Sequence, residues 1–318
     1  MSAIKLGIVG CGIAVKELHY PPLMELQDLF KVEGVTSRTE ESADECAKLF
    51  KTRSYAYEDL LDRVDAVDIA VPTHLNYEMI KKALDAKVNV ICEKPIAENV
   101  AAGKKIVELA KGSEAILYIA ENYRHSAVYA KAKEIMKRIG KPEFVLYSRF
   151  EHMKKDVKYA ATGWRKNPKH IGGFLSDGGV HDIAALRMVM GNIIRAKAFV
   201  SRARDYLGSC DTMSASLLFA DGALGTYSVS YGLAGESIFC ISGTEGFMKI
   251  RSDRRAIEVI TEKEFSVEEE SIEEENTYKK EFIDFYGVVN GKENSLGSPA
   301  EALEDLRVIE EAIKSSEL

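Results

Sequence analysis

Long apolar stretches are missing from this sequence of 318 residues, in which no uncharged apolar run approaches the roughly 18 residues that a bilayer-spanning helix needs. The first ten residues also lack the basic region, apolar core and small-residue cleavage site of a secretory signal, because they run directly into a strand pattern. These two absences argue against a membrane protein and predict a chain that stays in the cytoplasm.

Cysteine is scarce, and the five residues stand far apart with no Cys-x-x-Cys pair: Cys11, Cys46, Cys92, Cys210 and Cys240. An odd number and wide spacing favour reduced thiols in apolar segments over a disulfide framework or a structural zinc site, so we expect no metal. Basic residues are not in excess, because 43 Lys and Arg face 50 Asp and Glu, a net charge of −7, and no basic run is present. The composition therefore argues against a nucleic-acid partner.

What is present is 46% apolar and 29% charged residues, the composition of a globular protein, in a chain longer than one core usually organises. Up to about residue 121, short apolar runs alternate with helical patterns, as in right-handed βαβ units around a parallel sheet. The expected strands are residues 5–9, 31–36, 66–71, 89–92 and 115–120, and the expected helices are residues 15–29, 41–50, 76–86 and 100–111.

Beyond residue 121 a helix at 126–139 precedes strand-length runs, several joined by turn signals such as Asp221-Gly222. The expected strands are residues 143–151, 196–203, 212–219, 223–230, 237–242 and 247–250, and an amphipathic helix at about 298–316 closes the chain. The predicted fold class is therefore α/β. An N-terminal Rossmann domain with a doubly wound parallel sheet (residues 1–121) precedes a C-terminal α/β domain with a large, mostly antiparallel open sheet (residues 122–318).

A glycine-rich segment, Gly10-Cys11-Gly12-Ile13-Ala14-Val15, follows the first strand and opens a helix. Glycine at 10 permits a tight turn, and glycine at 12 lets the backbone approach a pyrophosphate at the helix N-terminus. The alternative is a purely structural turn, which the position inside a βαβ series disfavours. We expect a dinucleotide-binding loop.

The second strand ends at Thr36-Ser37-Arg38, the place where such domains recognise the adenosine ribose. A carboxylate here would accept from a 2′-hydroxyl and repel a 2′-phosphate, but this sequence has a hydroxyl and a guanidinium. We therefore expect NADP(H) to be preferred, with NAD(H) still possible. The alternative is that Arg38 is a solvated turn residue.

Three further segments carry chemistry. Glu93-Lys94-Pro95 follows a strand, where ligands bind in open α/β sheets, and lysine changes its pKa readily on desolvation. Asp177 and His181 lie in a glycine-rich segment and would share one face if it is helical, and histidine suits proton transfer near neutral pH. The Trp164 ring offers a surface on which a ligand can stack, and the adjacent Arg165 guanidinium offers several hydrogen-bond donors. Taken alone, Lys94 could be an ordinary loop residue and Trp164 a packing residue.

These pieces, in this order, resemble the glucose-fructose oxidoreductase/inositol dehydrogenase/rhizopine catabolism (Gfo/Idh/MocA) family over essentially the whole chain. The resemblance implies that Lys94, Asp177 and His181 contact the reacting hydroxyl, and that Arg124, Trp164 and Arg165 bind the substrate. It also implies that the cofactor is bound by Gly10, Cys11, Gly12, Ile13, Ala14, Ser37, Arg38, Pro72, Thr73, His74, Asn76, Glu93, Lys94, Asn122, Trp164 and Arg165.

The sequence departs from the family pattern at two positions. Val15 replaces the usual small residue at the third position of the loop, and Ala184 stands where many members have an acidic residue after the histidine. The second departure bears on how His181 is oriented, a role in which Asp182 could compensate.

The resemblance predicts an NAD(P)-dependent oxidoreductase acting on a secondary alcohol or carbonyl of a sugar, polyol or related small molecule. It also implies a homodimer or homotetramer formed through the C-terminal sheet. Two alternatives remain at this point: a catalytically weak NAD(P)-binding sensor of the same family, and a dihydrodiol-type dehydrogenase. The identity of the group that takes the proton, Lys94 or His181, also stays open.

Overall fold

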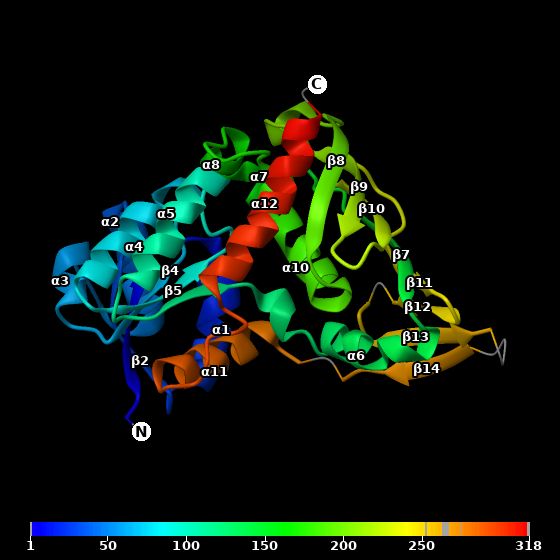
Figure 1. Cartoon of the computed structure of the whole chain (residues 1–318). Helices are drawn as coiled ribbons and strands as arrows, with labels where there is room; N and C mark the ends of the chain where they lie inside the picture. The colour runs from blue at the N-terminus through cyan, green and yellow to red at the C-terminus, as the bar shows by residue number, and fades with distance from the viewer. Residues whose placement is uncertain (1, 252, 263–266, 274, 317–318) are drawn as a thin grey trace. The chain divides into compact units, whose positions relative to one another are not determined.

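The computed structural model describes residues 2–251, 253–262, 267–273 and 275–316, which form two compact units (Figure 1). The N-terminal unit comprises Met1–His125 and Asn276–Glu304, and the C-terminal unit comprises Ser126–Glu275 and Asp305–Leu318. The boundary expected at residue 121 stays a prediction about domains. The grouping by contacts adds that residues 276–304 belong with the N-terminal unit.

A parallel sheet of six strands, in the order β3-β2-β1-β4-β5-β6, forms the centre of the N-terminal unit. Its strands are β1 (Ile4–Val9), β2 (Phe30–Thr36), β3 (Arg53–Ser54), β4 (Ala66–Ile69), β5 (Asn89–Glu93) and β6 (Leu117–Ala120). This is the strand order of a Rossmann fold, in which ligands bind outside the carboxyl ends of the strands. The predicted fold class of this unit is confirmed.

The helices of this unit are η1 (a π-turn, Val15–His19), α1 (Tyr20–Glu25), α2 (Glu40–Phe50), α3 (Tyr57–Leu61), η2 (Thr73–Leu75), α4 (Asn76–Asp85), α5 (Val100–Lys111), η3 (Asn122–His125), α11 (Thr277–Val289) and the start of α12 (Pro299–Ser315). The helix expected over residues 15–29 is wrong in its last part, because the helix ends at Glu25. The apolar spacing continues past Glu25 because Leu26 and Phe30 are also buried, although Leu26 lies in the turn that connects α1 to β2 and Phe30 begins β2.

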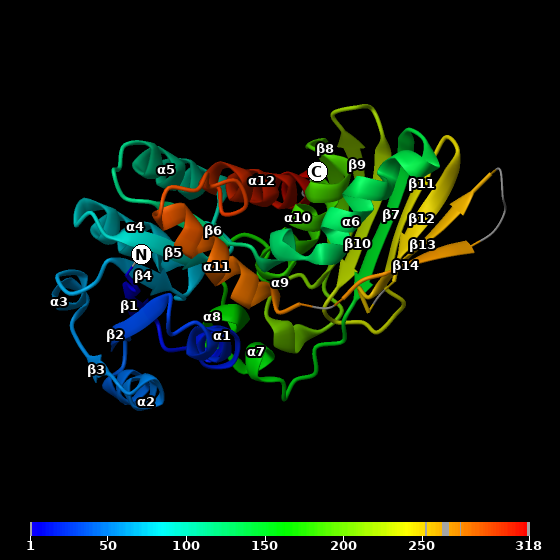
Figure 2. The same ribbon diagram turned by 90° about the horizontal axis from the view of Figure 1, so that it is seen from below.

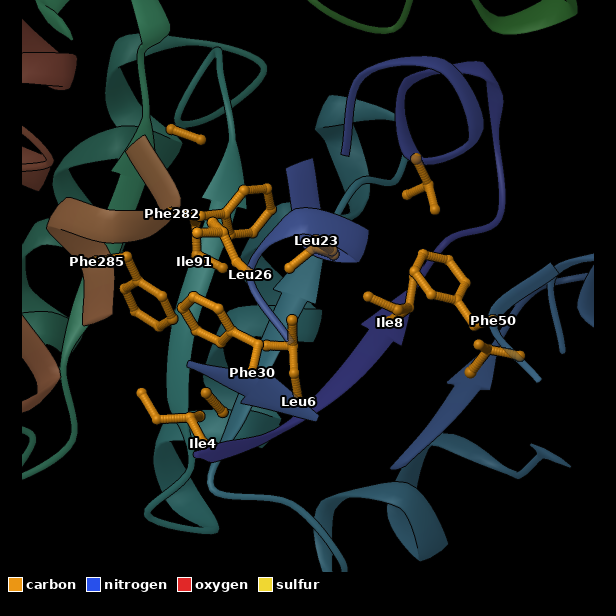
Figure 3. Close-up of a cluster of buried hydrophobic side chains, with 14 of the residues drawn as sticks. Ile4, Leu6, Ile8, Leu23, Leu26, Phe30, Phe50, Ile91, Phe282 and Phe285 are labelled. Carbon is orange, nitrogen blue, oxygen red and sulfur yellow. The ribbon is translucent and has the colours of Figure 1, made fainter. Parts of the chain in front are cut away.

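Figure 3 shows the core on one side of this sheet, where aromatic residues of α11 pack against β1, β2 and β5. The Phe30 ring stacks on Phe285 with centroids 6.3 Å apart and meets Phe282 edge-on at 5.8 Å. Both partners are at most 1% exposed. Helix α11 was not predicted from the sequence, and it completes this core from a distant part of the chain.

The C-terminal unit contains an eight-stranded sheet in the order β14-β13-β12-β11-β7-β10-β9-β8. Its strands are β7 (Pro142–Phe150), β8 (Ile193–Ser201), β9 (Thr212–Phe219), β10 (Leu224–Ser230), β11 (Ile238–Gly243), β12 (Gly246–Ile250), β13 (Ala256–Thr261) and β14 (Val267–Ser271). Only the β7–β10 pair is parallel among the described pairs. The mostly antiparallel sheet is confirmed, and the sequence reading missed β13 and β14.

Helices cover one face of this sheet, as Figure 2 shows for α6 and α10. The helices of the whole C-terminal unit are α6 (Ala127–Ile135), η4 (Met136–Ile139), α7 (Lys158–Ala161), α8 (Gly163–Lys166), α9 (Phe174–Asp177), α10 (Gly179–Met190), η5 (Asp205–Leu207) and the rest of α12. Helix α10 is almost entirely buried, which explains why it shows no amphipathic pattern. The end of α12 protects the edge strand β8, because Ser315 and Ser316 accept hydrogen bonds from its backbone amides.

No described helix is both long and apolar enough to cross a membrane.

Candidate active site

The glycine-rich loop leaves the carboxyl end of β1 and enters the π-turn. Gly10 has φ +94°, and a Cβ there would lie 2.4 Å from the Ala70 carbonyl oxygen, so only glycine fits. At Gly12 a Cβ would meet nothing within 4 Å, which leaves open space in front of the backbone. Cys11 is buried, with its thiol 3.6 Å from the Thr36 carbonyl oxygen, and Ile13 and Ala14 begin the helix. Such a loop suits a bound pyrophosphate.

Val15, the departure at the third loop position, is fully buried and belongs to the core cluster of this unit. It is the first residue of the π-turn, which ends at His19. Turns of this kind are rare and occur frequently at functional sites. The larger side chain is therefore accommodated in a helix start that departs from ordinary α geometry.

The end of β2 places Ser37 and Arg38 next to this loop. Ser37 is half-buried and Arg38 is exposed, and no described residue forms a hydrogen bond or ion pair with the Arg38 guanidinium. Thr39 begins α2 by accepting a hydrogen bond from the Ser42 amide. The guanidinium is thus available to an anion at the carboxyl end of β2.

The loop after β4 carries Pro72, Thr73, His74 and Asn76, of which Thr73 and Asn76 are buried. The Asn76 amide donates to the carbonyl oxygens of Pro95 and Ile96 at 3.0 and 3.3 Å. This side chain therefore fastens the loop after β4 to the segment that follows Lys94.

Glu93 ends β5, and its side chain turns toward a buried histidine, His19, to which the sequence motifs assign no role. The His19 ring lies between two carboxylates, with Nδ1 2.7 Å from Asp68 and Nε2 2.9 Å from Glu93. Burial lowers the pKa of His19, but the two carboxylates outweigh it and hold the pKa well above its usual value. Because ionised carboxylates only accept hydrogen bonds, both ring nitrogens donate in this arrangement, which is the imidazolium form.

A third carboxyl group, Glu281 of α11, completes what we call the His19 cluster: His19, Asp68, Glu93 and Glu281. Burial raises the pKa of Glu281 well above its usual value, and the nearby Glu93 adds to this effect. Asp68 Oδ1 and Glu281 Oε2 are buried without a hydrogen-bond partner among the described residues. An acidic residue inside the apolar run of β4 was the available signal for this cluster.

Asn122 and Arg124 follow β6 and are both buried. The Asn122 amide donates to the Thr277 hydroxyl at 2.9 Å, and the Arg124 guanidinium donates to the Leu296 carbonyl oxygen at 3.2 Å. Both side chains thus hold segments of the same unit in place.

In the C-terminal unit, Trp164, Arg165 and Asp177 lie together. The Arg165 guanidinium stacks over the Trp164 ring at 4.1 Å, and its Nε donates to Asp177 Oδ2 at 2.7 Å. His181 is half-buried in the first turn of α10. The helical segment is interrupted at Gly178, between Asp177 and His181, so the two residues belong to separate helices.

Asp182, next to His181, was a possible compensating partner for that histidine, but its described hydrogen bonds go to other residues. Its two oxygens accept from Tyr147 at 2.7 Å, from Tyr227 at 2.9 Å and from Arg149 at 2.9 Å. Arg149 also donates to the Tyr231 oxygen at 2.5 Å. We call this set, Asp182, Arg149, Tyr147, Tyr227 and Tyr231, the Asp182 cluster.

The structure brings the predicted residues together in two sets. The dinucleotide loop, Ser37 and Arg38, the loop after β4 and Lys94 all follow the carboxyl ends of strands in one sheet, so they share one edge. The second set, Trp164, Arg165, Asp177 and His181, belongs to the other unit. That the two sets meet at one substrate stays a prediction. Among the described residues, no group of three or more His, Cys, Asp or Glu is arranged to hold a metal ion.

Comparison with known proteins identifies the family. Residues 4–121 match the NAD-binding Rossmann fold of the Gfo/Idh/MocA oxidoreductase family, and residues 133–317 match its C-terminal alpha/beta domain. The chain therefore belongs to this family of oxidoreductases, as its motifs predicted.

Several relatives cover nearly the whole chain. An oxidoreductase of known structure from Thermotoga maritima is 46% identical, with a TM-score of 0.94 over 99% of this chain and 97% of that one. An uncharacterized protein of Saccharomyces cerevisiae is 30% identical over 99% of this chain and 97% of its own length.

Two more distant proteins have named substrates. A D-xylose 1-dehydrogenase (NADP(+)) of Haloferax volcanii is 25% identical over 98% of this chain and 97% of its own. Levoglucosan dehydrogenase, solved in complex with NADH and levoglucosan, shares the fold with a TM-score of 0.87 at 20% identity, over 99% of this chain and 98% of that one.

Proposed function

We propose that this protein is an NAD(P)-dependent dehydrogenase or reductase that acts on a secondary alcohol or carbonyl of a sugar, polyol or related small molecule. The observation that carries this proposal is Lys94, which follows β5 at the same sheet edge as the glycine loop after β1. The named activities of the D-xylose and levoglucosan dehydrogenases support the sugar class.

The residues at this edge fit a nicotinamide dinucleotide. The left-handed Gly10 and the open space in front of Gly12 allow close approach of a pyrophosphate, which the residues from Gly10 to Ala14 would hold. Ser37 and Arg38 would contact the adenosine ribose. Contacts at the nicotinamide end are assigned to Pro72, Thr73, His74, Asn76, Glu93, Lys94, Asn122, Trp164 and Arg165.

A nicotinamide held at this edge would supply the hydride acceptor for the substrate carbon, and the protein's own residues would remove the hydroxyl proton. His181 suits this role because imidazole is the side chain that most often serves as a general base near neutral pH. A cationic Lys94 would stabilise the developing alkoxide, and the two roles exchange if desolvation makes the amine neutral. Asp177 bonds Arg165, so we assign this pair, with Trp164 and Arg124, to holding the substrate.

The test is a screen of sugars and polyols with NAD⁺ and NADP⁺, following the absorbance of the reduced nicotinamide. We expect turnover with at least one pair. Lys94→Ala and His181→Ala should each lower kcat on the order of a hundredfold or more, with little change in cofactor affinity. Cofactor binding without turnover on any substrate would instead favour the sensor alternative, and near-normal turnover of the double variant would remove both residues from the chemistry.

We further propose that NADP(H) is preferred, because the exposed Arg38 guanidinium can bond a 2′-phosphate. Arg38→Ala should weaken NADP(H) binding by roughly 1.5 to 3 kcal/mol, and NAD(H) binding should barely change. Calorimetric titration of both cofactors measures this difference. Tighter binding of NAD(H) by the unmodified protein would contradict the preference.

The assembly that we propose is a homodimer or homotetramer formed through the open face of the eight-stranded sheet. An apolar row crosses this face, because Phe247 and Phe144 both pair with Ser242 of the strand between them, and Phe144 pairs with Leu224. Phe144, Leu224 and Phe247 are 40%, 54% and 38% exposed. Several large exposed apolar side chains on one sheet face favour an interaction site there.

A double variant, Phe144→Glu with Leu224→Glu, should make the protein monomeric, because buried like charges would oppose association. Light scattering coupled to gel filtration reads the mass. An unmodified protein that is already a monomer would remove this proposal.

The free cysteines of the described chain support a reducing compartment, and we propose the cytoplasm.

A further inference from the structure

The residues on both sides of Lys94 are fastened by side chains from other elements. On the N-terminal side, Glu93 bonds Nε2 of His19 at 2.9 Å. On the C-terminal side, the Asn76 amide holds the carbonyl oxygens of Pro95 and Ile96. Lys94 therefore stands in a short segment whose path is set on either side.

His19 is well placed to control this segment, because it joins three elements that meet at the cofactor edge. It ends the π-turn that follows the dinucleotide loop, Asp68 lies in β4, and Glu93 ends β5. The imidazole is 2% exposed and Asp68 is fully buried, and the Phe282 ring meets the imidazole edge-on at 5.5 Å. Both ring nitrogens therefore keep these two carboxylate partners in a dry environment, where hydrogen bonds are strong.

The direction of Glu93 limits the direction of Lys94. Glu93 is the last residue of β5 and Lys94 follows it directly, so a Glu93 side chain held at His19 fixes the backbone from which the Lys94 side chain leaves. Loss of the imidazolium would remove the cation that stands between the buried Asp68 carboxylate and the half-buried Glu93 carboxylate. Such uncompensated charges are costly, and the end of β5 would have to rearrange.

The charge that faces this segment is also set by His19. The titratable groups around the imidazole include Asp68 of β4, Glu93 of β5, Glu281 and the Tyr278 ring of α11, and Glu121 after β6 lies near Glu281. Among these groups His19 supplies the positive charge. Its removal would therefore make the field at the neighbouring Lys94 amine more negative.

We propose that His19, held between Asp68 and Glu93, is a positioning residue that sets the direction and the electrostatic environment of Lys94. This inference rests on the proposed function, in which Lys94 handles the proton or the alkoxide. It assigns no contact between His19 and the substrate.

The first experiment is a double-mutant cycle between His19→Gln and Lys94→Ala, with kcat measured on the best substrate of the screen. His19→Gln alone should lower kcat about tenfold, but in the Lys94→Ala background it should change kcat less than twofold. An equal loss in both backgrounds would show a general structural effect and would overturn the proposal.

The matched control is His125→Gln, because His125 is also a buried histidine of the N-terminal unit and bonds the Tyr118 hydroxyl at 2.8 Å. This control variant should keep kcat within about twofold of the unmodified protein. A tenfold loss from the control as well would show that any buried histidine of this unit disturbs the site.

The second experiment needs no turnover and separates failure of this inference from failure of the proposed function. Acetylation of Lys94 in the cofactor-free protein, followed by mass spectrometry across pH, reports the fraction of neutral amine. Without the imidazolium the amine holds its proton more tightly, so His19→Gln should slow acetylation roughly threefold near pH 8, and His125→Gln should not.

An unchanged acetylation rate in His19→Gln would overturn the inference, even if the protein is an active dehydrogenase. A slowed rate in a protein that turns over no substrate would support the positioning role and reject only the proposed function. If His19→Gln does not fold, Glu93→Gln tests the same link from the other end. This variant removes a negative charge beside Lys94, so acetylation should then become faster, and an unchanged rate would overturn the inference.

Discussion

The two buried polar clusters differ in how completely their groups are paired, although each contains the sequence neighbour of a residue proposed for the chemistry. In the Asp182 cluster one carboxylate faces one guanidinium, and both oxygens of Asp182 are bonded. In the His19 cluster one imidazole faces three carboxyl groups, and oxygens of Asp68 and Glu281 have no partner in the described chain.

This difference separates two uses of buried charge. A fully satisfied network rigidifies its surroundings. The Asp182 cluster accordingly connects α10, at the residue after His181, to β7 and β10 by hydrogen bonds. An unbalanced cluster contributes less stability, but it maintains a field that acts on neighbouring groups. We therefore expect substitutions in the first cluster to change folding stability and those in the second to change proton affinity.

The largest expected effect is that of Asp182→Asn on stability. The substitution leaves the mostly buried Arg149 guanidinium with the exposed Glu151 as its remaining ion-pair partner, which should lower the free energy of unfolding by about 2 to 4 kcal/mol. Urea unfolding followed by circular dichroism measures the change. A loss below about 1 kcal/mol would mean that this cluster is no better paired than the other.

A smaller effect on the free energy of unfolding is expected for Glu281→Gln, which should make the protein more stable at high pH instead of less stable. Because the pKa of Glu281 is raised in the folded state, the native protein binds this proton more tightly than the unfolded chain, and stability falls as pH rises above the unfolded pKa of about 4.3. The raised pKa of His19 acts in the same direction, since its contribution is lost as pH rises through the folded pKa.

The unmodified protein should therefore lose stability between pH 5 and pH 8, and Glu281→Gln should lose about 1 to 2 kcal/mol less, because glutamine does not titrate. Urea unfolding at the two pH values gives both slopes. Parallel slopes for the variant and the unmodified protein would show that Glu281 is ionised at neutral pH and would remove the contrast between the clusters.

The smallest expected effect is on thiol accessibility, which compares the two units directly. Cys11, Cys46 and Cys92 of the N-terminal unit are buried, whereas Cys210 and Cys240 of the C-terminal unit are half-buried. Under native conditions two thiols should react with a disulfide reagent faster than the other three, and all five should react after denaturation. A count below five in denaturing, non-reducing buffer would contradict the free thiols.

The sequence predicted those features that depend on local pattern. The alternation of strands and helices defines the Rossmann fold, and Gly10 is recognisable because the tight turn after β1 admits no side chain. The family motifs also point to Lys94 and His181, whose roles stay a prediction. Each of these signals is contained in a short stretch of sequence, so it can be recognised without knowledge of distant contacts.

Features that depend on distant contacts could not be predicted. The role of His19 depends on the burial of Asp68 and on α11, neither of which a local pattern reveals. Asp182 adjoins His181, but neighbouring residues on a helix point in different directions, and its partners come from three strand-borne side chains. Sequence proximity alone therefore does not identify these partners.

Helix α11 has a consequence for how the protein is made. Phe282 and Phe285 pack against Phe30, but the ribosome synthesises them only after the last strand of the C-terminal sheet, β14. A nascent chain that ends before Thr277 therefore exposes the apolar side of the parallel sheet that α11 later covers. We expect the N-terminal unit to acquire its native stability only near the end of translation, and a fragment of residues 1–125 to aggregate when it is expressed alone.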